Sequence, residues 1–267
     1  PTGFAWDDLV LPRETLDSLK EVTRFARYRP FLLEDWGFAA KLPYGRGVSA
    51  ILVGPPGTGK TMVAQLLAHE LGYDLYRIDL SQVVNKYIGE TEKNLARIFE
   101  EAETSHAVLF FDEADSLFGA RSEVRDSHDR YANIEVAYLL QRMEQFDGIA
   151  ILATNLRGNL DVAFSRRLQL IVHFPEPDAP TRTQLWRRHL AGFEPLDGAD
   201  PVDTEHLGRT VELAGGDIRN VVMAAAFAAA DDESPVGMRH VVTAVERELR
   251  KLGRRVAFLR KGAAHER

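Results

Sequence analysis

The sequence predicts an α/β domain built on a five-stranded parallel sheet with helices on both faces, followed by a small all-helical domain. Between residues 48 and 174, short apolar runs alternate with amphipathic helical patterns, and this alternation is typical of a parallel sheet covered by helices. Beyond a proline-rich break at 175–180, only helical patterns follow. We therefore expect an N-terminal segment at 1–47, the α/β domain at 48–175 and the helical domain at 176–267.

The individual elements follow from local hydrophobic spacing. In the N-terminal segment, Leu16, Leu19, Val22 and Phe25 recur at helical spacing and predict one helix before a loop at 43–47. The charged stretch 119–130 is predicted to be a mobile, solvated loop. The expected strands are 49–53, 75–80, 108–111, 149–154 and 169–174. The expected helices are 60–71, 92–105, 131–145, 182–191, 204–213, 217–230 and 238–252.

The composition narrows the class of protein. Hydrophobic residues make up 45% and charged residues 27% of the 267 residues, which is ordinary for a soluble globular protein. The formal net charge of −7 argues against general binding to nucleic acids or anionic membranes. The chain has no cysteine, which excludes disulfides and cysteine metal sites and fits a reducing cytosol. We expect a cytoplasmic protein, since neither a membrane span nor a signal peptide is visible.

The most specific motif is the run Gly-Pro-Pro-Gly-Thr-Gly-Lys-Thr at 54–61. It matches a phosphate-binding loop in the strand–loop–helix context that this motif requires. Backbone N–H groups would close around phosphate oxygens at a helix N-terminus, with Lys60 on the β- and γ-phosphates and the Thr61 hydroxyl on Mg²⁺. The sequence therefore predicts a site for a magnesium–nucleoside triphosphate. The expected nucleotide contacts are Gly54, Pro55, Pro56, Gly57, Thr58, Gly59, Lys60, Thr61 and Met62.

A second motif lies at the end of the third expected strand. The run 108–111 is continuously hydrophobic, as expected for a strand buried on both faces, and it ends in Asp112 and Glu113. Asp112 is expected to meet the Mg²⁺ held by Thr61, and Glu113 to orient and activate the attacking water. Asp115 nearby is interpreted as a helix cap only.

Asn155 follows the fourth expected strand, 149–154. A polar amide between the phosphate loop and the acidic pair would hold the attacking water or touch the γ-phosphate. The alternative is a plain turn residue, since asparagine is common in turns.

Together, these motifs resemble those of AAA+ ATPases over nearly the whole chain. The phosphate loop matches Walker A, residues 109–115 match Walker B, and Asn155 matches sensor 1. Residues 160–167 and 174–178 match the following part of the family pattern. The resemblance implies an ATPase that uses ATP and Mg²⁺, with the helical domain as a lid, and that works as a ring, commonly a hexamer.

The resemblance also implies an arginine that acts across the subunit boundary on the neighbour's ATP. We carry this role to Arg166 and Arg167, which stabilise charge in the transition state if they reach the phosphates. The two arginines are adjacent here, whereas the family commonly shows Arg-Pro-Gly-Arg. Which of the two acts on the neighbour's ATP therefore stays open. The alternative is that both are surface arginines at a helix end, without a catalytic role.

Two further regions resemble nucleotide contacts of the family. The paired glycines that include Gly216 would let a helix start approach the nucleotide, with Asp217 as its N-cap. Arg219 either contacts phosphate, like a sensor-2 residue, or faces solvent. Asp8 and Leu9 resemble the N-terminal segment that packs by the adenine.

Residues 86–89 are Lys86, Tyr87, Ile88 and Gly89, and they follow the second expected strand. AAA+ translocases that this chain resembles place an aromatic–hydrophobic–glycine loop there, projecting into the central pore. Tyr87, with Ile88 beside it, would grip an extended polypeptide by stacking and packing. A tyrosine tucked under the following helix is the alternative.

The stretch 121–135 resembles bacterial AAA+ ATPases found with extracellular contractile injection systems, which are phage-tail-like particles. This implies a role in assembling, loading or remodelling such a particle.

The leading hypothesis is an ATP-driven remodeller of proteins, with further copies of the chain and a polypeptide client as partners. The alternative is an assembly scaffold in which ATP sets ring formation but no substrate is threaded. The acidic charge disfavours a loader that acts on DNA. A small-molecule kinase is disfavoured because no acceptor pocket is evident and the arginine pair would be unexplained.

Overall fold

The computed structural model describes residues 4–41, 45–83, 90–105, 107–115, 127–155, 167–193 and 200–254. Contacts divide the chain into two compact units. The first comprises 1–55 with 60–175, and the second comprises 56–59 with 176–267. The three-part division expected from the sequence stays a prediction.

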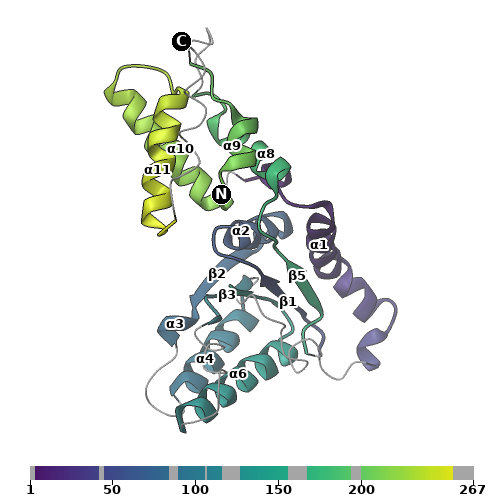
Figure 1. The fold of residues 1–267 in the computed structure, drawn as a ribbon. Coiled ribbons are helices and arrows are strands. Elements are labelled where there is room, and N and C mark those ends of the chain that lie inside the picture. Colours follow the sequence, from purple (N-terminus) through teal and green to yellow (C-terminus); the bar gives the residue numbers. More distant parts are fainter. Residues whose placement is uncertain are drawn as a thin grey trace, which may run out of the picture. The chain divides into compact units, whose positions relative to one another are not determined.

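The first unit is built on one parallel sheet of five strands in the order β2-β3-β4-β1-β5. Figure 1 labels β2, β3, β1 and β5 of this sheet. The predicted fold class is confirmed, and four strands differ from their expected limits by one residue at one or both ends. The strands are β1 Val48–Val53, β2 Asp74–Asp79, β3 Ala107–Asp112, β4 Ile149–Thr154 and β5 Leu170–His173.

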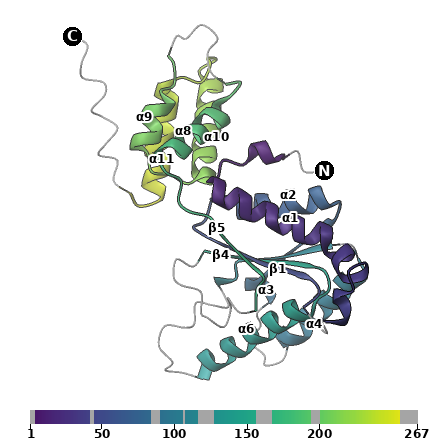
Figure 2. The same cartoon turned by 90° about the vertical axis from the view of Figure 1, so that its right-hand side faces the viewer.

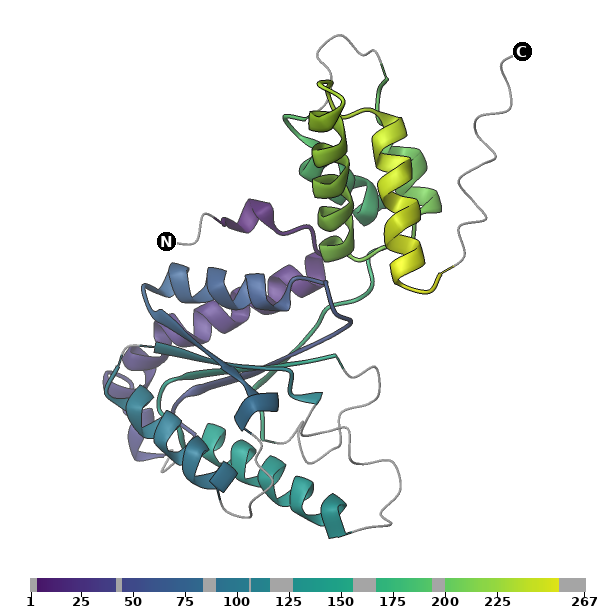
Figure 3. The ribbon, with the colours of Figure 1, turned by 90° about the vertical axis from the view of Figure 1, so that its left-hand side faces the viewer.

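Helices cover both faces of this sheet (Figures 2 and 3). One face carries α1 (Arg13–Glu34) and α2 (Lys60–Leu71). The other carries α4 (Glu90–Glu103) and α6 (Ser127–Gln145). The short helices are η1 Trp6–Asp8, η2 Phe38–Ala40 and α3 Leu80–Val83.

The double cover explains why the central strands read as continuous apolar runs. In β1, Ala50 and Leu52 pack in the core cluster with α1 and α2. The alternate residues Ile51 and Val53 pack in the cluster with α4 and α6. Because successive side chains point to opposite faces and both faces are covered, most residues of such a strand are apolar. The buried polar exception in β1, Ser49, accepts a hydrogen bond from the backbone N–H of Gln169.

The structure corrects the prediction for residues 127–130. They were expected to end a solvated loop, but α6 begins at Ser127. Adding one residue to an existing helix costs less free energy than nucleating a new helix. The helix formed by the apolar-patterned part of α6 therefore extends through the charged residues before it. The first helix is also longer than its apolar pattern, because α1 continues through Pro30 to Glu34.

The second unit is helical. Its helices pack around a core that includes Trp186, Ile218 and Val241. Asp178 and Asp203 are the N-caps of α8 and α9, and their side chains accept hydrogen bonds from the N–H groups of Thr181 and His206. The helices are α8 Ala179–Leu190, α9 Thr204–Thr210, α10 Gly215–Asp231 and α11 Met238–Lys251.

The prediction that Asp217 caps α10 is wrong. The N-cap is Ala214, and the paired glycines already form the first turn. Asp217 therefore lies inside that turn, where its negative charge still interacts favourably with the helix dipole. In the described part of the chain, every helix is too short or too polar to cross a membrane.

Candidate active site

The carboxyl ends of β1, β3 and β4 lie side by side, because the three strands are paired in parallel. The loop after β1 therefore lies beside the residues that follow β3 and β4. Strand order thus gathers three motifs that are far apart in the sequence at one edge of the sheet.

The phosphate loop depends on glycine for two different reasons. Gly57 and Gly59 have φ angles of 76° and 101°, which side-chain-bearing residues rarely adopt. Gly54 is required by packing, because a Cβ there would lie 2.1 Å from the backbone oxygen of Phe174 at the end of β5. The loop is thus set both by its own backbone conformation and by its contact with the sheet.

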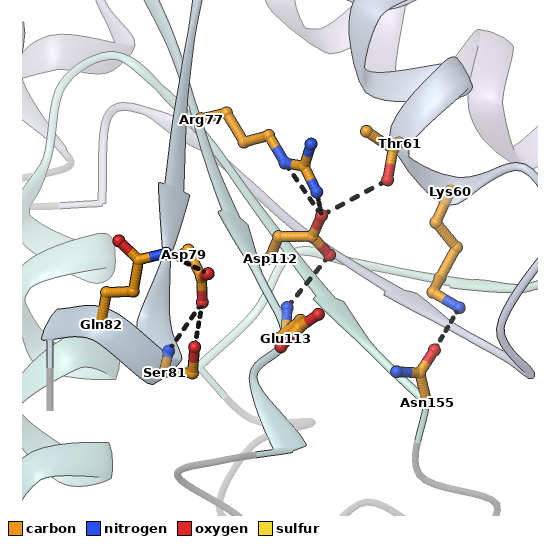
Figure 4. Close-up of polar contacts among 9 residues, drawn as sticks. All are labelled: Lys60, Thr61, Arg77, Asp79, Ser81, Gln82, Asp112, Glu113 and Asn155. Carbon is orange, nitrogen blue, oxygen red and sulfur yellow. Dashed lines mark hydrogen bonds and ion pairs between the residues drawn. The ribbon is translucent and has the colours of Figure 1, made fainter.

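Lys60, the first residue of α2, is buried and held by three acceptors. Its ammonium donates to the backbone oxygens of Gly54 at 2.5 Å and Pro55 at 2.9 Å. It also donates to Asn155 Oδ1 at 2.8 Å (Figure 4). Burial lowers the pKa of Lys60, while the negative charges of Asp115 and Asp112 oppose this shift. The three N–H groups match the three acceptors, so the ammonium is fully hydrogen-bonded.

Asp115 fixes the orientation of the Asn155 amide. Its carboxylate accepts from the backbone N–H of Asn155 at 2.7 Å and from the side-chain Nδ2 at 2.8 Å. The Thr154 hydroxyl also donates to it. The Asn155 amide nitrogen therefore faces Asp115 and its oxygen faces Lys60. The interpretation of Asp115 as a helix cap only did not include this positioning role.

Asp112 lies at the end of β3 with its side chain largely buried. Its Oδ2 accepts from the Thr61 hydroxyl at 3.4 Å. The same oxygen accepts from Arg77 Nε at 3.1 Å and Nη2 at 2.8 Å (Figure 4). Sequence reasoning did not identify Arg77. A charged residue in β2 was the feature that could have pointed to it. Arg77 lies two residues before Asp79, which pairs with Asp112 in the neighbouring strand β3.

Glu113 has a left-handed backbone, with φ of 56°, and an exposed side chain. Its N–H donates to Asp112 Oδ1 at 3.0 Å, so the turn also holds the aspartate. Non-glycine residues with such backbones cost free energy and occur often at functional sites.

The oxygens of Thr61 and Asp112 fit a magnesium ion chemically. Mg²⁺ prefers oxygen ligands and is usually held by one or two carboxylates together with waters and substrate phosphates. Within the described ranges, no group of three or more His, Cys, Asp or Glu side chains could hold a metal ion. Thr61 and Asp112 are thus the residues that would hold Mg²⁺ carried in with a nucleotide.

The remaining predicted residues are placed as follows. In the second unit, Gly216 N–H donates to the backbone oxygen of Gly57 at 2.9 Å. Asp8 accepts from the backbone N–H of Ala5 at 2.7 Å, and Leu9 packs in the core cluster that includes α1 and α2. The roles predicted for these residues at the nucleotide stay predictions.

Arg167 donates to the backbone oxygen of Ala137 in α6 at 3.5 Å. Arg219 is exposed. Arg166 and the predicted pore-loop residues 86–89 lie outside the described residues.

A phosphate loop after β1 and an Asp-Glu pair after β3, on a sheet of this strand order, define a P-loop ATPase domain. Residues 50–176 match the family model described as "ATPase family associated with various cellular activities (AAA)". The domain belongs to this AAA ATPase family, as the sequence motifs had indicated.

Curated proteins similar to this chain in sequence come from archaea, animals and plants. A cell division cycle protein 48 homolog of Archaeoglobus fulgidus is 32% identical over 239 residues, covering 87% of this chain and 31% of that protein. Vacuolar protein sorting-associated protein 4B of Mus musculus is 33% identical over 222 residues, covering 81% and 48%. Protein SUPPRESSOR OF K(+) TRANSPORT GROWTH DEFECT 1 of Arabidopsis thaliana is 31% identical over 221 residues, covering 81% and 49%. The chain thus spans less than half of the length of each of these relatives.

Proposed function

We propose that this protein binds Mg²⁺ and ATP at residues 54–61 and hydrolyses the ATP to drive work on a protein client. The observation that carries the proposal is the convergence of Lys60, Asn155 and Asp112 at one sheet edge. Lys60 would bind the phosphates, and Asn155, held by Asp115, would orient the γ-phosphate or the water. Mg²⁺, when bound to Thr61 and Asp112, supplies positive charge that stabilises the transferring phosphoryl group.

Glu113 is the proposed general base. It is exposed at the end of β3, next to Asp112, and its carboxylate is the nearest acidic side chain in sequence to the metal-binding aspartate. A carboxylate that accepts a proton from water contributes about 10²- to 10⁴-fold to a rate.

The first experiment compares Glu113→Gln with Lys60→Ala in nucleotide binding and turnover. Glu113→Gln should keep ATP affinity and lose at least about 100-fold in turnover. Lys60→Ala should lose tight ATP binding. A matched control is Glu233→Gln, because Glu233 is also exposed and also has a positive φ, 48°. Normal turnover in Glu113→Gln would refute the assignment of the base.

Self-association into a ring is the second part of the proposal. The C-terminal part of α1 and the η2 region carry six exposed large hydrophobic side chains close together in the sequence, and we call these the aromatic patch. Clusters of this kind often mark interaction surfaces. The aromatic patch consists of Phe25, Tyr28, Phe31, Leu32, Trp36 and Phe38.

Sedimentation velocity tests this part of the proposal. The double variant Phe31→Ser/Trp36→Ser removes the tilted ring pair of the aromatic patch, whose centroids lie 5.5 Å apart. It should remain monomeric at concentrations where the wild type associates with ATP. The control is Phe193→Ser, which removes a similarly exposed aromatic ring from the second unit. Equal association of both variants and the wild type would exclude the patch as the contact between protomers.

The proposed client is an extended polypeptide gripped by Tyr87. Sequence resemblance supports this role and also the further role at a contractile injection particle, which rests on the stretch 121–135. Tyr87→Ala decides between a remodeller and a scaffold. A remodeller should keep ATP turnover and lose work on its client, whereas a scaffold should lose neither turnover nor assembly.

A further inference from the structure

Arg77 places a positive charge on the carboxylate that the proposed magnesium ion needs. Two of its nitrogens, at 2.8 and 3.1 Å, contact Oδ2 of Asp112. This is the same oxygen that faces the hydroxyl of Thr61. The other carboxylate oxygen, Oδ1, already accepts from the N–H of Glu113. Oδ2 is thus the atom that Arg77 and a metal ion would share.

The two cations cannot both keep close contact with this oxygen without strong repulsion, because like charges a few ångströms apart disfavour each other in a partly buried site. The Asp112 side chain is only 13% exposed, so the interaction is poorly screened on that side. The Arg77 side chain is 59% exposed, so its guanidinium can move into solvent without leaving a buried charge. Arg77 would therefore move away from Asp112 when a metal ion binds there.

A second carboxylate lies on the same side of β2. Asp79 follows Arg77 by two residues, so both side chains point to one face of the sheet. Asp79 accepts from the Ser81 hydroxyl at 2.5 Å and from Gln82 at 2.9 Å (Figure 4). The Ser81 hydroxyl lowers the pKa of Asp79 most, and the positive charge of Arg77 lowers it further. Asp79 is thus an ionised group already within the electrostatic reach of Arg77.

We propose that Arg77 is a positioning residue that occupies Asp112 in the absence of metal and moves toward Asp79 when Mg²⁺ enters with the nucleotide. The arginine therefore raises the Mg²⁺ concentration that the site requires. The inference rests on the proposed binding of Mg²⁺ and ATP. No covalent bond is made or broken in this exchange of ion pairs.

The test measures binding, so it does not depend on turnover. A fluorescent ADP analogue is titrated into the protein over a series of free Mg²⁺ concentrations and also in EDTA. Arg77→Ala should lower the Mg²⁺ concentration at which the tightening of analogue binding is half-maximal by about two- to fivefold, the range expected from an ion pair whose cation is largely exposed. Its affinity for the analogue in EDTA should stay close to that of the wild type.

Asp79→Asn should shift the Mg²⁺ requirement in the opposite direction, because the displaced guanidinium loses its second partner. The double variant Arg77→Ala/Asp79→Asn should match Arg77→Ala alone, since Asp79 acts only through the arginine. A matched control is Arg97→Ala, which removes an exposed arginine from an ion pair with Glu101 in α4.

An unchanged or raised Mg²⁺ requirement in Arg77→Ala, with an unchanged melting temperature, would overturn the inference. Additive shifts in the double variant would overturn the exchange between the two carboxylates. If the wild type binds the analogue equally with Mg²⁺ and with EDTA, the proposed magnesium site itself fails, and the inference fails with it.

Discussion

The left-handed backbone of Glu113 allows its structural strain to be separated from its proposed catalytic role. Its φ of 56° lies in a region that costs a side-chain-bearing residue about 1–2 kcal/mol. Glycine adopts the region freely but loses about 0.5–1 kcal/mol more chain entropy on folding. Glu113→Gly should therefore be more stable than Glu113→Ala by about 0.5–1 kcal/mol.

Thermal and urea denaturation of both variants measure this difference. For a domain of this size, it corresponds to about 1–4 °C in melting temperature. Alanine is the reference because it removes the carboxylate and keeps the strained Cβ. Glu233→Gly against Glu233→Ala repeats the comparison at the other positive φ, 48°, away from β3.

Both Glu113 variants should lose ATP turnover as severely as Glu113→Gln, because all three lack the carboxylate. Stability and activity should thus move in opposite directions when glycine replaces the glutamate. A Glu113→Gly protein less stable than Glu113→Ala would refute the strain argument. Turnover within a few-fold of the wild type would refute the proposed base.

Three further predictions concern other parts of the chain. Asp115→Ala should lower turnover by about 10- to 100-fold with ATP affinity largely kept, since hydrogen bonds between charged groups and their partners are worth about 1.5–3 kcal/mol; single-turnover kinetics would show no change if Asn155 orients itself. Arg166→Ala and Arg167→Ala, assayed separately against protein concentration, should leave one variant inactive yet able to bind ATP; activity independent of concentration and of both arginines would exclude a shared site. Burial, followed by the positive charges of Arg219 and Arg188, lowers the pKa of His189, so the unfolded chain binds more protons and stability should fall as the pH decreases below about 6.5. Urea titrations at pH 7 and pH 5 should show this loss in the wild type and in the control His206→Gln but a smaller one in His189→Gln.

The sequence alone determined the fold class, the limits of the five strands to within one residue, and the nucleotide loop. These features depend on hydrophobic spacing and on a contiguous motif, which are local. The start of α6 and the cap of α10 were missed for a related reason. The charged residues 127–130 and the glycine pair carry no apolar period, although each lies in a helix.

Only the tertiary structure revealed that Arg77 contacts Asp112 and that Asp115 orients Asn155. These partners are separated by 35 and 40 residues, and they meet because β3 lies between β2 and β4. Strand order and register set which side chains become neighbours, and neither is a property of any short segment. The residues that would bind the nucleotide can therefore be identified from the sequence. The residues that hold them in place can be identified only once the order and register of the strands are known.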